Sequence, residues 1–180
     1  VAAFPIPEVI RGINAFAAGV NEVNPEATVE VVWTSTWFGP EVETQAANAL
    51  LEKGADVLAQ HQDSTATGLA AEAAGAKWIS YNTAYGQDSA PEAFVTAPVW
   101  DWGPYYVNIV EQIIDGTFTT ESYWGGMETG LVSLYDLSSD VPSDTATLIA
   151  EKTEAIIDGT LEVEIVEEEF ISNVIGTVNP

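Results

Sequence analysis

The chain has 180 residues, of which 47% are hydrophobic, and it carries 28 acidic residues against four basic ones, for a formal net charge of −24. This composition excludes an intrinsically disordered chain, and the length allows one good core or one domain plus part of another. A surface this acidic repels phosphate backbones and anionic lipids, so we expect no nucleic-acid partner and no membrane binding through a basic patch.

The charge and the cysteine count say something about the setting of the protein. We attribute the acidity to a salty environment, because salt screens the self-repulsion it causes; an ordinary acidic secreted protein is the alternative. The sequence has no cysteine, which excludes disulfides, thiol catalysis and Cys-based metal sites. Val1–Phe4 resembles the end of a buried strand without a lead-in, so we expect the numbering to start inside a longer protein.

The first hundred residues alternate between helical and strand patterns. Apolar spacing and Gly or Pro boundaries predict helices over Pro7–Val23, Pro40–Lys53 and Ser64–Ala74. Runs of β-branched and apolar residues predict strands over Thr28–Trp33, Ala55–Gln60, Lys77–Tyr81 and Ala93–Val99, the last interrupted by Pro98. This alternation is typical of parallel βαβ units, so we predict an α/β fold with a doubly wound parallel sheet.

The pattern changes after Trp100. Helices are predicted over Trp102–Asp115 and Pro142–Asp158, each ended by the sequence IIDGT, in which we interpret the Gly as a helix stop. Residues 121–130 are predicted to be irregular, Leu131–Leu134 to be a short strand and Leu161–Val166 to be an edge strand. The sequence predicts no structure for Glu167–Pro180.

Aromatic and polar side chains follow the predicted strands. Trp37 and Phe38 come after the first of these strands, and His61, Gln62 and Asp63 after the second. Further aromatic residues occur at or past later strand ends, namely Tyr81, Tyr85, Trp100 and Trp102. Open α/β sheets bind ligands along the edge formed by the carboxyl ends of their strands, and a planar polar ligand needs stacking surfaces beside hydrogen-bonding groups.

These residues are not all equally expected to contact a ligand. We favour stacking for Trp37, core packing for Trp33 and Tyr81, and ligand contact for His61, Gln62 or Asp63, with a structural histidine as the alternative. His61 is the single histidine, and its neighbours Asp63 and Ser64 share one loop, whereas a catalytic triad needs groups from separate segments. One histidine and scattered carboxylates predict no metal site, and no phosphate-binding loop is present. We therefore expect no catalytic residue and no cofactor.

Five ordered blocks together resemble one family. They are FPIPEVIRGINAFAAGVNEVNP (4–25), VVWTSTWFGPEVE (31–43), GADVLAQHQDS (54–64), VWDWGPYY (99–106) and YWGGMETGLV (123–132). This set is similar to the basic-membrane-protein family of ABC-transporter substrate-binding proteins, whose best-known branch is the purine nucleoside receptors. The resemblance implies a type I periplasmic-binding-protein fold, in which two lobes close on a ligand about a hinge.

The resemblance also implies a domain layout. Residues 1–99 would form most of the second ligand-binding lobe, and the first lobe would be largely absent from this chain. Residues 100–133 would be the hinge crossings and a segment returning to that first lobe. Residues 134–180 would return to the second lobe and end in a tail.

The resemblance implies ligand roles at matched positions. Trp37 stands where the nucleoside receptors have a base-stacking Phe, Asn82 where they have a ribose-binding Asp, and Trp100 where a ribose-contacting Lys is expected. The differences at Asn82 and Trp100 remove contacts to a sugar, and they favour a free nucleobase or another flat ligand. The full predicted ligand-binding set is Phe4, Trp37, Phe38, His61, Gln62, Asp63, Asn82, Tyr85, Trp100 and Trp102.

The function implied is that of an extracytoplasmic binding protein, periplasmic or lipid-anchored to the outer face of the cell membrane. Its partners would be a purine-like small molecule and the membrane permease of an ABC importer. Two alternatives stay open: a sensor lobe of the same fold, and an α/β nucleoside hydrolase-like enzyme in which Asp63 or His61 would be needed for base release.

Overall fold

The computed structural model describes residues 1–176. Its helices are α1 (Pro7–Val23), α2 (Pro40–Glu52), α3 (Ala66–Ala74), α4 (Gly86–Ser89), α5 (Gly103–Asp115) and α6 (Ser143–Ile157), with a 3₁₀ turn η1 (Met127–Thr129). Its strands are β1 (Val29–Glu30), β2 (Val57–Ala59), β3 (Lys77–Ile79), β4 (Phe94–Thr96), β5 (Pro98–Trp100), β6 (Val132–Leu134) and β7 (Val174–Ile175). Prolines begin α1 and α2, where a missing backbone N–H costs nothing.

The strands of the main body run parallel in a doubly wound order. β2, β3 and β4 pair in sequence, and β7 pairs with β1. The segment Val1–Ala3 joins the two groups, because Ala2 bridges in parallel to both Trp33 and His61. The resulting order is β7, β1, Val1–Ala3, β2, β3, β4, which confirms the predicted doubly wound parallel sheet. Between Val1–Ala3 and β2 the order reverses, as at the switch point of such sheets.

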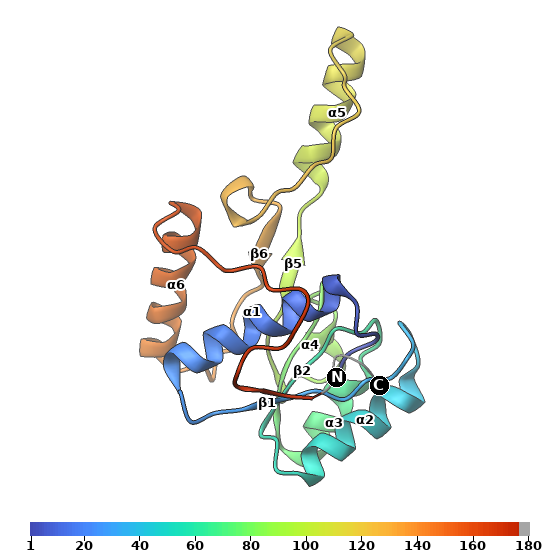
Figure 1. Cartoon of the computed structure of the whole chain (residues 1–180), viewed down its shortest axis with the longest axis vertical. Coiled ribbons are helices and arrows are strands. Elements are labelled where there is room, and N and C mark those ends of the chain that lie inside the picture. Colours follow the sequence, from blue (N-terminus) through green and yellow to red (C-terminus); the bar gives the residue numbers. More distant parts are fainter. Residues whose placement is uncertain (177–180) are drawn as a thin grey trace.

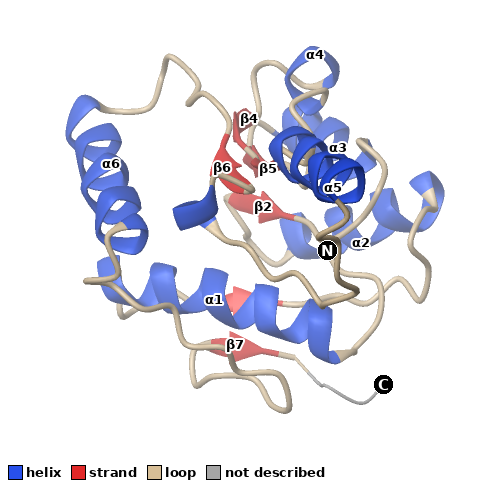
Figure 2. Ribbon diagram, turned by 90° about the horizontal axis from the view of Figure 1, so that it is seen from above, coloured by secondary structure: helices blue, strands red, loops and turns tan. Residues whose placement is uncertain are grey.

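Helices cover both faces of this sheet. Figure 1 shows α1 on one side of the strands and α2 and α3 on the other, and Figure 2 gives the same separation from above. The core between α3 and the sheet is built around Trp78, which is fully buried beside Phe94. A Cβ at Gly68 would lie 2.2 Å from the Trp78 ring, so glycine alone allows α3 to pack this closely.

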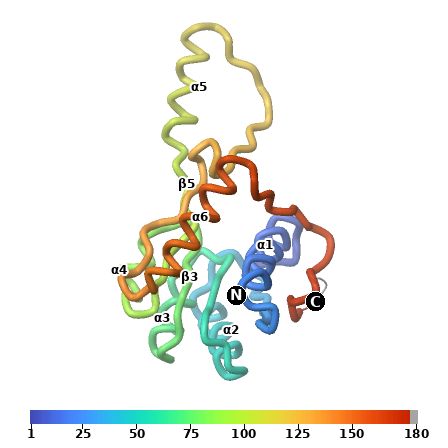
Figure 3. The backbone as a smooth tube through the Cα atoms, turned by 90° about the vertical axis from the view of Figure 1, so that its left-hand side faces the viewer, coloured from blue at the N-terminus to red at the C-terminus, as the bar shows by residue number. Residues whose placement is uncertain are grey.

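A second region rises away from this body. β5 and β6 form an antiparallel pair in which Pro98 faces Leu134. Between these strands, α5 and the chain that follows it project as a single arm, seen in Figure 1 and as an open loop in Figure 3. No residue of α5 is buried, and its apolar side chains Tyr106, Val107, Val110, Ile113 and Ile114 are exposed.

The C-terminal segment runs along α1. The buried amide of Asn14 donates to the carbonyls of Val166 and Glu169 at 2.9 and 2.8 Å, and the Asn173 amide donates to Ala17. The predicted edge strand Leu161–Val166 is therefore wrong, since this segment has no strand and bonds to a helix side chain instead. β7 lies in the tail for which the sequence predicted no structure. Residues 177–180 of that tail fall outside the described residues.

Other strand predictions need correction. The expected strand Ala93–Val99 is two strands in two sheets: β4 joins the parallel sheet, and β5 begins at Pro98 in the antiparallel pair. Thr28–Trp33 keeps regular pairing only at Val29–Glu30, where it meets β7, and at Trp33. The short α4 and η1 were not expected, because each is a single turn with no periodic pattern.

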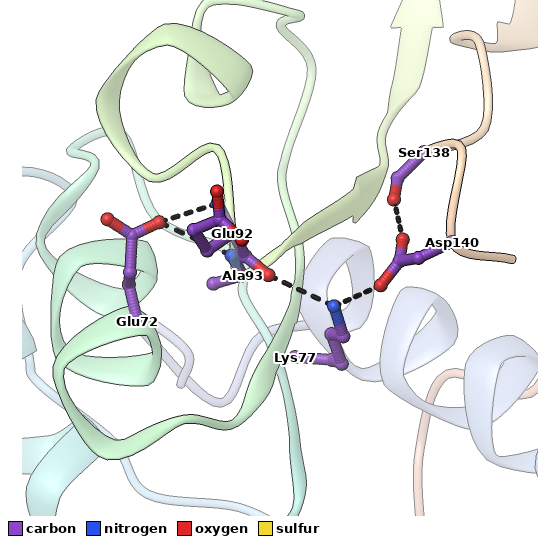
Figure 4. Close-up of polar contacts among 6 residues, drawn as sticks. All are labelled: Glu72, Lys77, Glu92, Ala93, Ser138 and Asp140. Atoms are coloured by element: carbon purple, nitrogen blue, oxygen red, sulfur yellow. Dashed lines mark hydrogen bonds and ion pairs between the residues drawn. The ribbon is translucent and has the colours of Figure 1, made fainter.

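The four basic residues all form ion pairs with acidic side chains. The pairs are Arg11–Glu167, Lys53–Glu30, Lys77–Asp140 and Lys152–Glu22. Figure 4 shows the third: Lys77 on β3 also donates to the carbonyl of Glu92, while Ser138 donates to Asp140. On the other side of that figure the Glu72 carboxylate accepts from the backbone of Glu92 and Ala93. Each of the four basic side chains thus joins segments that are far apart in the sequence, and two of the pairs, Lys53–Glu30 and Lys77–Asp140, involve a strand.

Candidate functional site

The candidate site lies where Val1–Ala3, β1, β2 and β3 end. The backbone N–H of Thr34 donates to Ala2 and that of His61 to Val1, so the loops after these strands share one edge of the sheet. The N–H of Asp63 donates to the carbonyl of Trp37 at 3.1 Å, which joins the two loops directly. This edge contains the switch point, where open α/β sheets form their ligand crevice.

Four rings gather at this edge. The Trp37 ring lies 5.2 Å from Phe4, edge to face, and 6.2 Å from His61. His61 in turn lies 4.3 Å from the Tyr81 ring. Trp37 keeps 40% of its surface exposed and is therefore available for a flat ligand. The structure thus brings together three predicted residues and adds Tyr81, which the sequence assigned to core packing.

His61 and Tyr81 are joined by a hydrogen bond. The Tyr81 hydroxyl lies 3.0 Å from Nε2 of His61. Burial lowers the pKa of His61, against the opposing effects of the Glu8 and Asp63 carboxylates, so the imidazole is neutral near pH 7. Burial likewise raises the pKa of Tyr81 and keeps the phenol protonated. The pair is uncharged and offers hydrogen bonds without charge.

A second group of predicted residues lies beside the first. The Trp100 indole Nε1 donates to Oδ1 of Asn82 at 2.5 Å, and Trp100 stacks on Trp102 at 5.8 Å with a 9° angle between the rings. Asn82 follows Tyr81 in sequence, so the two groups are continuous. Since Trp100 ends β5, this group connects the sheet edge to the antiparallel pair below the arm.

The backbone is strained at two positions of this edge. Ser35 and Asn82 have φ values of 57° and 56°, in the left-handed region that non-glycine residues seldom adopt. Such strain persists only where the surroundings hold it in place, and it is concentrated at functional sites. Asn82 is additionally bridged to Val99 of β5, which fixes the loop after β3 against the β5–β6 pair.

Two polar residues that the sequence analysis missed, one buried and one half-buried, hold the loops from beneath. Glu43 of α2 is fully buried; its carboxylate accepts from the N–H of Gly39 at 2.9 Å and from the Ser64 hydroxyl at 2.5 Å. The Gln60 amide donates to the carbonyls of Gln62 and Ser64. Glu43 stands four residues after Gly39, and this spacing could have predicted the bond, because an acidic side chain near the start of a helix often accepts from the backbone N–H of the capping residue.

The remaining predicted residues are spread around the edge. Gln62 is only 1% exposed, and its amide donates to the Thr34 hydroxyl, so its side chain lies under the loops. Phe38, Asp63 and Tyr85 are exposed, and Tyr85 is the N-cap residue of α4. Within residues 1–176, no three acidic or histidine side chains are arranged to hold a metal ion, and no helix is long and apolar enough to cross a membrane.

Comparisons with known proteins agree on one family. A family model described as ABC transporter substrate-binding protein PnrA-like, or Bmp, matches residues 1–167. A putative ABC transporter glucose-binding protein of Haloferax volcanii is 43% identical over 163 residues, which cover 91% of this chain and 41% of that protein. A purine-binding protein of Brucella abortus is 41% identical over 162 residues, covering 87% of this chain and 44% of that protein.

A solved structure supports the fold. An ABC-transporter solute-binding protein from Conexibacter woesei superposes with a TM-score of 0.76 at 25% identity, covering 91% of this chain and 55% of that chain. These similarities confirm the resemblance stated from the five sequence blocks and the α/β fold it implies. The chain spans less than half the length of the two curated relatives, at 41% and 44%.

Proposed function

This chain belongs to the PnrA-like family of ABC-transporter substrate-binding proteins, and on that premise we propose that it forms most of one lobe of a receptor for a flat, neutral, purine-like ligand. Proteins of this family are extracytoplasmic, bind small molecules and act with membrane permeases. We propose the same partners for the protein that contains this chain, with a periplasmic location or a lipid anchor on the outer face of the cell membrane.

The observation that carries the proposal is the mixed edge at the switch point. Trp37 offers an exposed indole beside Phe4, and the neutral His61–Tyr81 pair lies next to it. Stacking of a base on an aromatic side chain contributes roughly 1–3 kcal/mol, and neighbouring polar groups then select among bases by their edges. The purine-binding relative, 41% identical to this chain, supports the same ligand class.

The charge distribution favours an uncharged ligand. All four basic side chains of the chain are already paired with carboxylates. Glu8 and Asp63 lie close enough to His61 to affect its titration, so the field at this edge is negative. A phosphate or carboxylate group would meet repulsion here without an unpaired cation on the described part of this lobe. Nucleotides should therefore bind far more weakly than bases or nucleosides.

The arm supports the proposed domain layout. We propose that residues 1–99 and 134–180 belong to one lobe, while residues 100–133 cross the hinge and contribute to a first lobe that this chain does not contain. Exposed apolar side chains along all of α5 are expected where a helix packs against a neighbouring domain. The relatives, more than twice as long as the matched region, have enough additional residues for such a lobe.

Direct titration tests the proposal. We would follow the tryptophan fluorescence of the intact protein in molar salt against adenine, adenosine, AMP and glucose. Saturable quenching by adenine or adenosine, with AMP at least tenfold weaker, is expected. Saturation by glucose alone would favour the second candidate ligand class, which the printed name of the 43% identical relative supports. Turnover of adenosine to adenine would instead support the nucleoside hydrolase alternative.

A further inference from the structure

Glu43 is a buried acid that bonds to both loops of the candidate site. The side chain stands in the first turn of α2, has no exposed surface, and uses its two oxygens for two different segments. Oε1 accepts from the backbone N–H of Gly39 at 2.9 Å, and Oε2 accepts from the Ser64 hydroxyl at 2.5 Å. Gly39 ends the loop that carries Trp37, and Ser64 lies near the end of the loop that follows β2.

An acid at this position has to be explained by these two bonds. Burying a carboxylate is unfavourable unless hydrogen bonds inside the protein replace those that it made to water. None of the four basic side chains, all of which lie among the described residues, forms an ion pair with Glu43; each pairs with another carboxylate. Apolar residues fill the other buried positions of α2, namely Ala46, Ala47 and Leu50. The two loop bonds are what an acid provides here and an apolar residue cannot.

The two loops are also joined on the near side of Trp37. The backbone N–H of Asp63 donates to the Trp37 carbonyl at 3.1 Å. The Gln62 amide donates to the hydroxyl of Thr34, three residues before the indole. Glu43 adds a third connection, two residues after the indole. The backbone that carries Trp37 is therefore held before, at and after that residue.

The turn between the Trp37 loop and α2 is tightly packed. A Cβ at Gly39 would lie 2.8 Å from Cγ2 of Val42 and 2.9 Å from Cγ2 of Thr36. The Gly39 carbonyl also accepts from the backbone N–H of Glu43 at 2.9 Å, so these two residues share two hydrogen bonds. The end of the loop is thus fixed to the helix by both the backbone and the side chain of Glu43.

We propose that Glu43 is a positioning residue of the ligand site, whose carboxylate joins the two loops and thereby holds the exposed indole of Trp37 in the orientation that stacks on the ligand. The inference rests on the proposed function, in which Trp37 is the stacking surface, and deepens it. Glu43 is fully buried, so it acts without a contact of its own to the ligand. A side chain that is already ordered loses little conformational entropy on binding, and the affinity rises accordingly.

The first test needs no ligand. In the intact protein labelled with 5-fluorotryptophan, the ¹⁹F signals of Trp37 and Trp124 are assigned by their loss in the corresponding Phe variants. Glu43→Met keeps the length of the side chain and removes both acceptor oxygens. The Trp37 signal should then shift or broaden, while that of Trp124, on the arm, stays unchanged. An identical Trp37 signal in wild type and variant would overturn the inference.

The second test measures the affinity of the intact protein for adenine by isothermal titration calorimetry. Glu43→Met should bind roughly three- to tenfold more weakly, as expected when one aromatic side chain has to be ordered on binding. In a Trp37→Ala background the same change should alter the affinity by less than about twofold, because nothing is left to position. Glu43→Gln can still accept from Gly39 and can donate to the Ser64 oxygen, so it should recover most of the affinity.

A second variant and a matched control cover the case in which Glu43→Met does not fold. Ser64→Ala removes one of the two bonds and leaves the acid in place, so it should give a smaller loss of affinity that again depends on Trp37. Asn14→Leu is the control, because Asn14 is also buried and its amide donates to the C-terminal segment. It should lower the stability of the protein without changing the affinity for adenine.

The outcomes separate the two proposals. An affinity for adenine that is unchanged in Glu43→Met and Ser64→Ala, or that falls equally with and without Trp37, would overturn the role of Glu43 and leave the purine proposal intact. Absence of adenine binding by the wild type would overturn the purine proposal, and the fluorine signal of Trp37 would then decide whether Glu43 holds the indole.

Discussion

The sheet body and the α5 arm use apolar side chains in opposite ways. In the body, small residues such as Ala47 and Ala71 pack α2 and α3 around Trp78, and nothing of that indole is exposed. In the arm, the helix α5 also carries many apolar residues, but each of its side chains is at least partly exposed. Helical periodicity therefore predicts a helix in both regions. Burial depends on a second element to pack against, and among the described residues only the helices of the body have one.

The largest expected effect breaks the packing of the body. Gly68→Ala would place a Cβ 2.2 Å from the Trp78 ring, and neither α3 nor the sheet can move freely. We expect the free energy of unfolding to fall by about 3 kcal/mol, as severe overpacking does. Urea denaturation measures it, with Gly19→Ala in α1 as control, because nothing lies near that Cβ. Equal stability of the two variants would contradict the packing described.

A charge on the arm sharpens the comparison. Ile114 is 77% exposed here, so Ile114→Glu should change the stability of the 180-residue chain by less than about 0.5 kcal/mol. In the intact protein, where we propose that a first lobe covers α5, the same change should cost about 2–3 kcal/mol, because it buries an unpaired charge. Thermal and urea unfolding of both proteins, with Glu111→Gln as control, test this. Equal effects in both would argue against the proposed domain layout.

Trp37→Ala tests the ligand edge of the body. Loss of a stacking surface should weaken purine binding by about 1–3 kcal/mol while leaving stability nearly unchanged, because 40% of Trp37 is already exposed. Isothermal titration calorimetry measures the affinity. Trp33→Phe is the control, since the Trp33 ring stacks on Phe170 at 6.2 Å, beside the C-terminal segment. Unchanged affinity in Trp37→Ala would assign Trp37 a structural role only.

Salt should stabilise the protein because of its net charge of −24. Screening of repulsion among 28 acidic residues should outweigh the weakening of four surface ion pairs, each worth about 0.2–1 kcal/mol. We expect Tm to rise by roughly 5 °C or more between low salt and 2 M NaCl, which corresponds to about 1–2 kcal/mol. Calorimetry in NaCl, repeated with an uncharged osmolyte of equal osmolality, measures the effect. A Tm that does not change with NaCl concentration would argue against the proposed adaptation to salt.

The sequence predicted most of the helices because their boundaries are local. Pro7 and Asn24 delimit α1, and Gly75 and Gly116 end α3 and α5 in the left-handed conformation. The strands were harder to predict, because pairing depends on distant segments. β5 leaves the parallel sheet to pair with β6, more than thirty residues later. The alternating pattern of Leu161–Val166 resembles a strand, but the Val166 carbonyl accepts from the Asn14 amide instead of from a neighbouring strand.

The candidate site was predictable in its location and not in its internal bonding. Strand ends followed by Trp37, His61 and Asn82 were visible in the sequence, because the carboxyl ends of parallel strands meet at one edge. The contact of Tyr81 with His61 was not visible, since it depends on how the loops after two different strands meet. Such details follow from three-dimensional contacts that no local pattern encodes.

The smallest expected effect concerns the contact between the two regions. Arg11 of α1 pairs with Glu167 at 2.8 Å, and its guanidinium lies 4.8 Å from the ring centre of Trp124, in the chain returning from the arm. Arg11→Met should lower the free energy of unfolding by about 1 kcal/mol, because it removes an exposed ion pair and a cation–π contact. Arg11→Lys should retain part of both contributions.

Lys53→Met is the matched control for Arg11, because it removes an ion pair that stays within the body. Urea denaturation at low salt compares the three variants, and the difference in emission between each protein and its Trp124→Phe counterpart reports whether that ring loses a neighbour. An equal loss in Arg11→Met and Lys53→Met, without a change in emission, would argue against α1 as an attachment point of the arm. A larger loss in Arg11→Met would make α1 an attachment point of the arm. The proposed first lobe would then be coupled to the helix in which Gly12 lies beside the His61 ring.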